Sequence, residues 1–511
     1  MKLLYKIKTS FAITMLFCIL NACTKNFDEL NTDPAIVTET LVNPDNLFSR
    51  VQKESIFSIP DFSRVSEFAG FMANEASGFP FKNQDYDFSV WYRTYLINLN
   101  ETIRLTQNTP ELSNKNAMAR IFRVWLYQIL TDRYGDIPYT EAASALENFI
   151  ATPKYDKQEF IYKDLFTQLK AATAQLSDDP SKRSYGAADI LFGGNVDRWR
   201  KFGNSLRLRM AIRVRFVDNA LAQQNISDVI SAPLIIANAE NAKLLSEGSG
   251  ASNMNNRNPI LNFITNGNQE PRHFSFTVLE LMAKNNTNDP RIPIYFKLPL
   301  YINPGSSIPY KARPINIDGP EKTPYGRDSI SFVGNFFEAS QFTFNLITAA
   351  QVNFLKAEAA LAGLIPDDAN NLYRAGIQLT MQQYGVSAGD ITTFLAGSTA
   401  TLSGTVEGKL EQIINQKYLS LIYQSDEAWA EYRRTGYPKM WLGSAPTDTQ
   451  GKIPRRLTYP LDEYAKNDVN VAAAAAILPG GDKLTTRLWW DVKAGLPYAH
   501  PRQGMFPPES W

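Results

Sequence analysis

Between residues 45 and about 230, apolar residues recur at three- and four-residue spacing, and this pattern constrains the fold more than any other feature. Glycine and proline turn signals separate the apolar segments, namely Gly135, Pro138, Pro153, Gly193 and Gly194. Such spacing predicts amphipathic helices joined by short turns. The sequence therefore predicts a mainly α fold in which helices stack as pairs.

One of these helices can be tested by its geometry. At about 100 degrees per residue, five large apolar residues fall within roughly a third of the helix circumference. They are Trp199, Phe202, Leu206, Met210 and Val214. Arg213 falls inside the same stripe, and a buried arginine without a partner costs several kcal/mol. We therefore expect Arg213 to meet an acidic side chain or a carbonyl group. Trp91, Tyr95, Trp125 and Trp429 also sit in helical patterns and are expected in the core.

The remaining chain alternates between loops and helices. Residues 232–342 are rich in Asn, Gly, Ser and Pro, which predicts loops and short strands. Helix returns at 344–363 and 367–385, where small residues such as Ala360 and Gly376 let two helices approach closely. That spacing resembles a degenerate tetratricopeptide repeat. A long helical stretch is predicted over 406–437.

The N-terminus has the signature of a bacterial lipoprotein signal. Lysines at positions 2, 6 and 8 precede a short apolar run, Phe11 to Leu20, that is too short to span a bilayer. Cys23 follows, which predicts a signal peptide over 1–22, lipid attachment at Cys23 and a tether over 23–44. Thr24 and the acidic pair Asp28 and Glu29 favour the outer membrane and the cell surface. The alternative is an ordinary signal peptide that happens to contain a cysteine.

Composition excludes several classes of function. Fifty-two Lys and Arg residues nearly cancel 51 Asp and Glu residues, so nucleic acid is not an expected partner. The two cysteines are Cys18, inside the signal segment, and Cys23, so we expect no disulfide and no thiol nucleophile. His273 and His500 are too few for a His-based zinc site, and both are expected to be surface or satisfied core residues.

Nine segments spread over the chain resemble the SusD/RagB nutrient-binding outer-membrane lipoproteins of gut and related Bacteroidetes. Their number and order carry the resemblance. They are NFDELNTDP (26–34), ILTDRYGDIPYTEA (129–142), PKYDKQEFIYKDLFTQL (153–169), GGNVDRWRKFGNSLRLRMAIR (193–213), NDPRIPIYF (288–296), FLKAEAALAG (354–363), QKYLSLIYQSDEAWAEYRRTGYP (416–438), PRRLTYPLDE (454–463) and GGDKLTTRLWWD (480–491). Two positions depart from the usual pattern, Asn195 for Asp and Gly203 for Ala.

The resemblance implies a helical solenoid of tetratricopeptide-like pairs with a less regular, loop-rich part packed on it. One domain would span 45–511, with its scaffold over 45–230 and 344–437 and loop-rich insertions over 232–342 and 438–511. Members bind a glycan or another nutrient without cleaving it, and act as the lid of a SusC-like TonB-dependent transporter. No cofactor is implied, and whether a structural calcium ion binds to a loop stays an open question.

Exposed aromatic rings in polar loops are the expected ligand contacts, because sugar C–H faces stack on flat rings. The loop before Trp91 offers Phe79, Phe81, Asn83 and Tyr86 among polar neighbours. Tyr301, Tyr310 and Trp441 lie in or beside other loops. For each ring the alternative is local packing. Trp489 and Trp490 lie inside a family segment and are interpreted as structural.

Paired carboxylates raise the alternative of a surface glycan hydrolase. Asp132 with Asp136, and Glu427 with Glu431, would share helix faces, but arginines lie beside both pairs. Structural ion pairing is therefore the favoured interpretation. The basic run from Arg198 to Arg215 is interpreted as a solvated face with one or two internal ion pairs. A third possibility is a purely structural helical-repeat protein without a small ligand.

Overall fold

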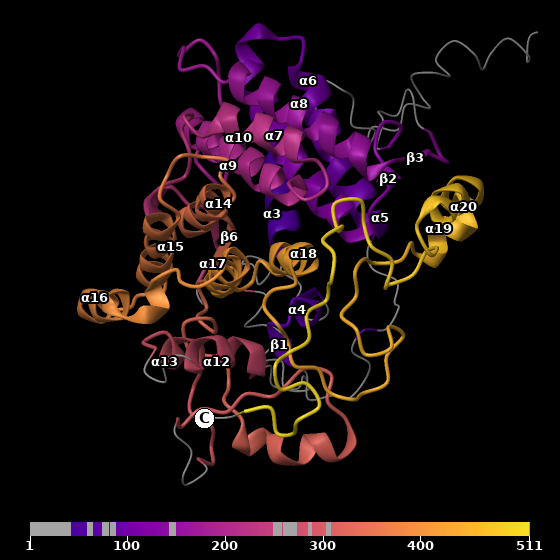
Figure 1. The fold of residues 1–511 in the computed structure, drawn as a ribbon. Coiled ribbons are helices and arrows are strands. Elements are labelled where there is room, and N and C mark those ends of the chain that lie inside the picture. Colours follow the sequence, from indigo (N-terminus) through magenta and orange to yellow (C-terminus); the bar gives the residue numbers. More distant parts are fainter. Residues whose placement is uncertain are drawn as a thin grey trace, which may run out of the picture. The chain divides into compact units, whose positions relative to one another are not determined.

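Helices dominate the computed structural model, as the apolar spacing predicts (Figure 1). It describes residues 42–58, 65–73, 81, 88–142, 150–248, 258, 273–284, 289–302 and 308–509. The compact unit Asp45–Trp511 holds the elements below. Its helices before residue 230 are α3 (Pro44–Ser58), α4 (Val65–Phe68), α5 (Phe88–Val90), α6 (Ile97–Thr106), α7 (Ser113–Tyr134), α8 (Gln158–Gln175), α9 (Val196–Val214) and α10 (Asn219–Val229), with a π-helical segment at Trp91–Leu96.

Later helices are shorter and separated by longer irregular segments. They are α12 (Phe276–Ala283), α13 (Ile292–Tyr295), α14 (Ala349–Leu361), α15 (Ala369–Gln383), α16 (Ala388–Ala396), α17 (Val406–Ser420), α18 (Ser425–Thr435), α19 (Leu461–Lys466) and α20 (Asp468–Ile477). Antiparallel two-stranded sheets pair β1 (Met72–Ala73) with β5 (His273–Phe274), β2 (Ile137–Pro138) with β3 (Tyr155–Asp156), and β4 (Ala242–Leu245) with β6 (Thr343–Ile347). No helix in the described ranges is both long and apolar enough to cross a membrane.

Helix α9 begins and packs as its sequence predicts. The side chain of Asn195 accepts a hydrogen bond from the backbone N–H of Arg198 at 2.9 Å, so Asn serves as the N-cap here. Gly203 allows α9 to approach α8 closely, because a Cβ there would lie 2.4 Å from Thr173 Cγ2 on α8. All five residues of the predicted stripe, from Trp199 to Val214, are buried.

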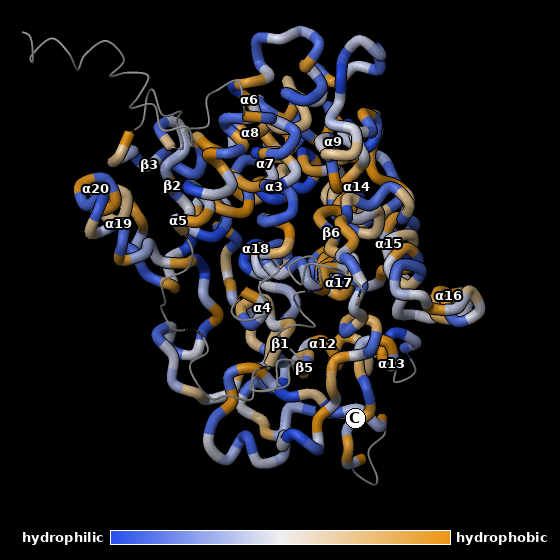
Figure 2. The backbone as a smooth tube through the Cα atoms, turned by 180° about the vertical axis from the view of Figure 1, so that it is seen from behind, coloured by the Kyte–Doolittle hydropathy of each residue, from blue (hydrophilic) through white to orange (hydrophobic). Residues whose placement is uncertain are grey.

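Helices that are neighbours in the sequence pack on each other. Helix α7 packs on α8, α9 on α10 and α14 on α15, and α8 also contacts α9 (Figure 1). Between α14 and α15, a Cβ added to Gly376 would lie 2.7 Å from the Phe354 ring. The small residue therefore allows the close contact that the sequence predicts. Figure 2 shows apolar and polar positions alternating along these helices, as expected for elements that bury one face.

Two predicted helices differ from the structure. The helix expected from residue 344 begins only at Ala349, because Thr343–Ile347 pairs with β4 as strand β6. The helical stretch expected over 406–437 is divided into α17 and α18. Tyr423, between them, has a φ of 68°, which is outside the right-handed helical region. The expected core aromatics are confirmed, since Trp91, Tyr95, Trp125, Trp429 and Trp490 are buried and Trp489 is partly buried against the core.

Candidate ligand-binding surface

The segment 296–302 follows α13 and runs antiparallel to 328–333. Phe296 forms a bridge with Val333, and the backbone N–H of Lys297 donates to the carbonyl of Phe332 at 2.9 Å. Farther along, the N–H of Tyr301 donates to the carbonyl of Asp328 at 2.7 Å. Pro299 has no N–H to donate, which suits an edge segment that pairs on one side only. These backbone contacts pair residues 296 and 297 with 333 and 332 and, past a bend at Leu300 and Tyr301, tie Tyr301 to Asp328.

Four apolar side chains of this segment face solvent. The exposed fractions are 49% for Leu298, 75% for Leu300, 61% for Tyr301 and 44% for Ile302. Single exposed apolar residues are common, but exposed apolar groups gathered at one place are a feature of interaction sites, and here four lie within five residues. We call Leu298, Leu300, Tyr301 and Ile302 the Tyr301 surface.

The Tyr301 surface is supported from the interior by strand β5. His273 is buried, its Nδ1 lies 2.9 Å from the carbonyl oxygen of Ser331, and its ring centroid lies 5.1 Å from that of Phe332. Burial lowers the pKa of His273 to about 4, so the imidazole is neutral at neutral pH. The N–H of Ser331 in turn donates to the carbonyl of Lys311 at 2.7 Å. The segment opposite Tyr301 is thus tied to the core by backbone and side-chain contacts.

The predicted ligand contacts fall into three groups. Tyr301 is exposed, and Tyr310 is half-buried against the main core, where burial raises its pKa. Phe81 and Trp441 are 1% and 2% exposed, so the expectation that their rings stand in solvent is wrong. The remaining candidates, Phe79, Asn83 and Tyr86, lie outside the described residues, as does Cys23.

Long-range packing explains the burial of Phe81 and Trp441. The Phe81 ring centroid lies 6.0 Å from that of Phe68 on α4. Trp441 belongs to a small cluster with Phe276 and Tyr325, and its Nε1–H donates to the carbonyl of Arg502 at 3.0 Å. Neither ring offers a face to a ligand.

The aliphatic members of the Tyr301 surface do not belong to the residue type that predicts sugar contacts, which is an aromatic ring in a polar loop. Leu298, Leu300 and Ile302 come directly after the family segment NDPRIPIYF and before an Asn, Pro, Gly and Ser run. The sequence signal for them is a short apolar run that contains a proline and does not follow the helical period. It indicates an extended edge whose apolar side chains are not all needed by the core.

Three of the four carboxylates considered for catalysis, Asp132, Glu427 and Glu431, are buried in ion pairs, whereas Asp136 is half-buried. Arg213 Nη2 donates to Glu427 Oε2 at 2.5 Å and Arg213 Nη1 to Glu431 Oε1 at 3.1 Å. Its Nε lies 3.6 Å from Asp132 Oδ2. The predicted acidic partner of Arg213 is therefore confirmed. Asp136, in turn, accepts a hydrogen bond from the backbone N–H of Gln158 at 2.8 Å.

Glu358 and Glu431 extend this cluster. Arg434 donates to both oxygens of Glu358, at 2.5 and 2.7 Å, and to Glu431 at 2.6 Å. Burial alone would raise the pKa of Glu358, but Arg434 and Arg215 overcome it and lower the pKa to about 2. The pKa of Glu431 is likewise lowered, since Arg434 and Lys417 outweigh burial. Both side chains stay ionised and are unsuited to donate a proton.

The basic run on α9 is not a solvated face. Arg207, Arg209 and Arg213 are buried, and the other basic residues of the run are half-buried. Arg207 meets Asn225 and Asp228 on α10 at 2.6 Å each. The interpretation as a solvated face is therefore wrong. The charged side chains of this run instead form contacts that join α9 to its neighbours.

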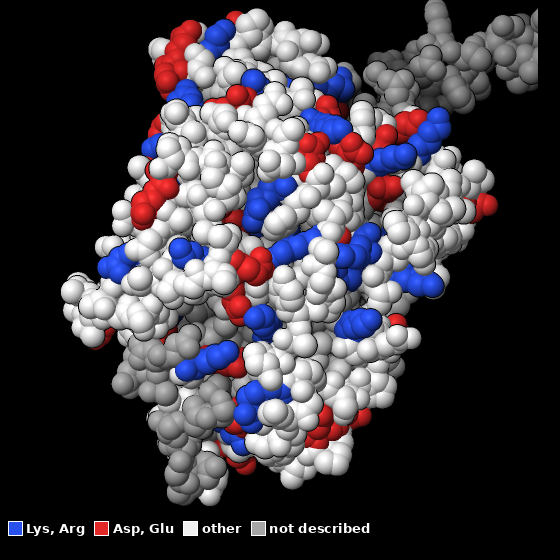
Figure 3. All heavy atoms as spheres, viewed as in Figure 1, with Lys and Arg blue, Asp and Glu red and all other residues white. Residues whose placement is uncertain are grey.

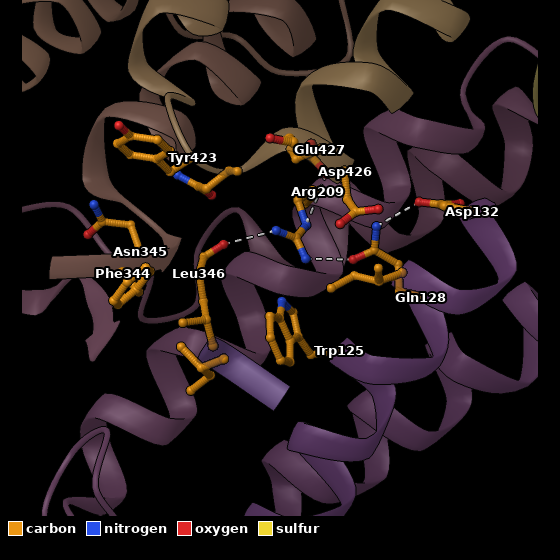
Figure 4. A pocket seen from close by; sticks show the side chains of 14 residues that line it. Trp125, Gln128, Asp132, Arg209, Phe344, Asn345, Leu346, Tyr423, Asp426 and Glu427 are labelled. Atoms are coloured by element: carbon orange, nitrogen blue, oxygen red, sulfur yellow. Dashed lines mark hydrogen bonds and ion pairs between the residues drawn. The ribbon is translucent and has the colours of Figure 1, made fainter. Parts of the chain in front are cut away.

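A small cavity lies beside the carboxylates of Asp132 and Glu427 (Figure 4). Arg209 crosses it, donating to the carbonyl of Leu346 at 3.1 Å and to Gln128 Oε1 at 2.5 Å. Its lining includes Asp132 and Glu427, and burial raises the pKa of Asp132. Its volume of about 40 Å³ has room for one or two water molecules and not for a sugar ring. The cavity therefore gives no support to the glycan hydrolase alternative.

Comparisons with known proteins place the chain in a family. Residues 41–460 match the SusD-like family, described as starch-binding and associating with the outer membrane. A comparison with curated proteins gives no match. Among solved structures, a chitin-binding protein is 26% identical with a TM-score of 0.76, over 88% of this chain and 100% of that one.

Two further solved structures agree. A SusD homologue from Bacteroides uniformis is 26% identical with a TM-score of 0.74, over 88% of this chain and 98% of that one. A chitin-binding SusD homologue from Flavobacterium johnsoniae is 25% identical with a TM-score of 0.73, again over 88% and 98%. The chain therefore belongs to the SusD-like family of non-catalytic, outer-membrane-associated glycan-binding proteins.

Proposed function

We propose that this protein is a lipid-anchored, cell-surface nutrient-binding protein that captures a glycan on the Tyr301 surface and delivers it to a TonB-dependent transporter. The observation that carries the proposal is the solvent-facing ring of Tyr301, 61% exposed, among three exposed aliphatic side chains on a fixed segment. An exposed aromatic ring among apolar side chains suits the C–H faces of sugar rings.

The electrostatics favour a neutral ligand. Figure 3 shows positive and negative side chains interspersed over the face it draws, with no large region of one sign. The formal net charge of the whole chain is +1. A polyanion would need a field of one sign, so a neutral polysaccharide fits better. The family description names starch, and two relatives are described as chitin-binding, which supports glucan and chitin oligosaccharides as first candidates.

Anchoring and delivery rest on the N-terminal motif and on the family. The short apolar run before Cys23 supports lipid attachment there, with the signal peptide over 1–22 and the tether over 23–44. We further infer that the stacked helix pairs form a solenoid within the single domain 45–511. A SusC-like transporter would be its membrane partner, with this protein as the lid.

Affinity electrophoresis tests the binding claim. The chain from Thr24 onward is run on native gels that contain starch, chitin derivatives or other neutral polysaccharides, and reducing ends are assayed in parallel. We expect retardation by at least one glycan without new reducing ends. New reducing ends would contradict a binding-only function. A failure of every glycan to retard the protein would contradict the glycan assignment.

A pull-down tests the partner. The lipidated protein is purified from membranes with an affinity tag in mild detergent. Recovery of an outer-membrane barrel protein in about equal amount is the expected result. Its absence under conditions that keep the lipid anchor intact would contradict the lid role and leave the binding claim to the gels.

A further inference from the structure

A second cavity lies among α12, α15, α17 and two irregular segments. Its volume is about 510 Å³, within the range of small-molecule sites, and it shares no lining residue with the Tyr301 surface. In contrast to the 40 Å³ cavity beside Arg209, it has space for one or two sugar rings. We call it the α17 pocket.

The wall of the α17 pocket is mostly polar. Hydroxyl groups come from the segment after α16, at Ser398, Thr399, Thr401 and Ser403. Side-chain amides come from α17, at Gln412, Asn415 and Gln416. Hydroxyl and amide groups both donate and accept hydrogen bonds, which is what a hydroxyl-rich ligand requires.

The charged groups of the wall compensate one another. Glu411 Oε2 accepts from Lys439 Nζ at 2.8 Å. Glu280 lies 2.9 Å from His500 Nε2, whose Nδ1 accepts the backbone N–H of Arg502 at 3.1 Å. The wall carries two carboxylates, Glu280 and Glu411, and two ammonium groups, Lys284 and Lys439, so its net charge is close to zero. This favours a neutral ligand over an ionic one.

Several polar groups of the wall are left available. Asn415 Oδ1 is buried and has no hydrogen-bond partner in the part of the chain that the structure describes. Within the same ranges, the hydroxyl groups of Ser398, Thr401 and Ser403 make no side-chain hydrogen bond. A buried acceptor without a partner has lost its hydrogen bonds to water without gaining others, which is destabilising. A hydroxyl group placed opposite Asn415 would remove this destabilisation.

A glycine lies in the wall of the pocket. It is Gly408, near the start of α17, where a Cβ would meet only Thr405 Oγ1, at 3.4 Å. A larger side chain therefore has room at this position, and glycine inside a helix has a poor intrinsic propensity. A leucine here would add bulk to the wall without a clash at its Cβ.

We propose that the α17 pocket is a second binding site for a neutral mono- or disaccharide, separate from the Tyr301 surface. Asn415 Oδ1 accepts a hydrogen bond from a ligand hydroxyl, and the hydroxyl groups after α16 surround the remaining ring substituents. The site recognises a small sugar by polar contacts, whereas the Tyr301 surface contacts a polymer through apolar ones.

Saturation-transfer NMR tests the proposal with four probes: glucose, N-acetylglucosamine, maltose and diacetylchitobiose. The protein is the chain from Thr24 onward, as wild type and as the variants Asn415→Leu, Gly408→Leu, Tyr301→Ala and Gln378→Leu. Gln378 is an exposed α15 residue in a different groove and serves as the matched control. Melting temperatures verify that each variant is folded.

We expect at least one probe to bind wild type and Gln378→Leu alike, with the signal reduced at least fivefold in Asn415→Leu and in Gly408→Leu but less than fivefold in Tyr301→Ala. Gly408→Leu is expected to melt no lower than wild type, so its loss of binding would not reflect unfolding. Absence of signal with all four probes in wild type would overturn the proposal. So would a signal that Tyr301→Ala removes and the α17-pocket variants retain, although that result would agree with the proposed function.

Discussion

The buried ionic cluster and the Tyr301 surface invert the usual distribution of side chains. In the cluster, defined by Arg213, Glu358, Lys417, Glu427, Glu431 and Arg434, charged groups are buried and each faces an opposite charge. In the Tyr301 surface, apolar groups face water. The first arrangement fixes how helices meet, and the second leaves contact area for a ligand.

The difference shows how this chain separates stability from recognition. Arg213 lies on α9, Glu358 on α14, Lys417 on α17, and the other three members on α18, so the cluster joins four helices. Removing one member leaves a buried charge without compensation. By contrast, the exposed side chains at 298–302 can change without affecting the core.

The largest expected effect is on stability, from Arg434→Met. Arg434 is fully buried and pairs with two carboxylates, so its loss should lower the free energy of unfolding by about 3–5 kcal/mol. Urea unfolding followed by circular dichroism measures this change. The matched control is Lys466→Met, in the exposed pair with Asp462, which should leave the midpoint unchanged. Equal midpoints for both variants would contradict a stabilising role of the cluster.

A second effect is a pH dependence from His273, beneath the Tyr301 surface. Its ordinary pKa of 6.5 applies in the unfolded chain, and burial lowers its pKa to about 4 in the folded chain. Between these values the unfolded chain binds more protons, so stability falls as pH falls from about 6.5 to 4, by about 2–3 kcal/mol.

His273→Gln should remove this part of the pH dependence. Urea midpoints measured from pH 7 to pH 4 would then change less in the variant than in wild type. Below about pH 4.5, the lowered pKa of Glu358 should cause a further loss of stability in both proteins, complete near pH 2. An identical slope for both proteins between pH 6.5 and pH 4 would rule out a neutral buried His273.

Trp441→Phe should separate packing from binding. The variant loses the hydrogen bond from Nε1 to the Arg502 carbonyl, which should lower the free energy of unfolding by about 1 kcal/mol. Retardation on glycan-containing gels should stay as in wild type, because the ring is buried. A loss of retardation in a folded Trp441→Phe protein would show that Trp441 contributes to the ligand site.

The smallest effect is expected from Leu300→Ser. Leu300 is 75% exposed, so the substitution should not change the melting temperature. It removes apolar area beside Tyr301, and we expect roughly threefold weaker glycan binding. Titration of the variant against the retarding glycan measures this. Unchanged affinity would limit the contact surface to Tyr301 itself.

The helical scaffold could be predicted because its signals are local. The stripe from Trp199 to Val214 on α9 follows from helical period alone, and the acidic partner of Arg213 follows from the cost of burying a charge. The division at Tyr423 could not be predicted, since nothing in the neighbouring residues breaks the helical pattern. Strand β6 was missed because its pairing with β4 bridges about a hundred residues.

The candidate site was less predictable, because it too depends on contacts between residues that are distant in sequence. Whether a loop aromatic faces solvent depends on partners distant in sequence. Trp441 is covered by Phe276 and by residues near Arg502, whereas Tyr301 is 61% exposed on a segment whose backbone bonds to Asp328. Residue type identified Tyr301 as a candidate, but only tertiary contacts separate it from Phe81 and Trp441.

Isothermal titration of wild type and Tyr301→Ala, with the glycan that retards wild type on native gels, decides whether Tyr301 is a glycan contact. We expect at least tenfold weaker binding by the variant, equivalent to about 1.4 kcal/mol, at an unchanged melting temperature. Equal affinity of the two folded proteins would place glycan capture elsewhere on the chain.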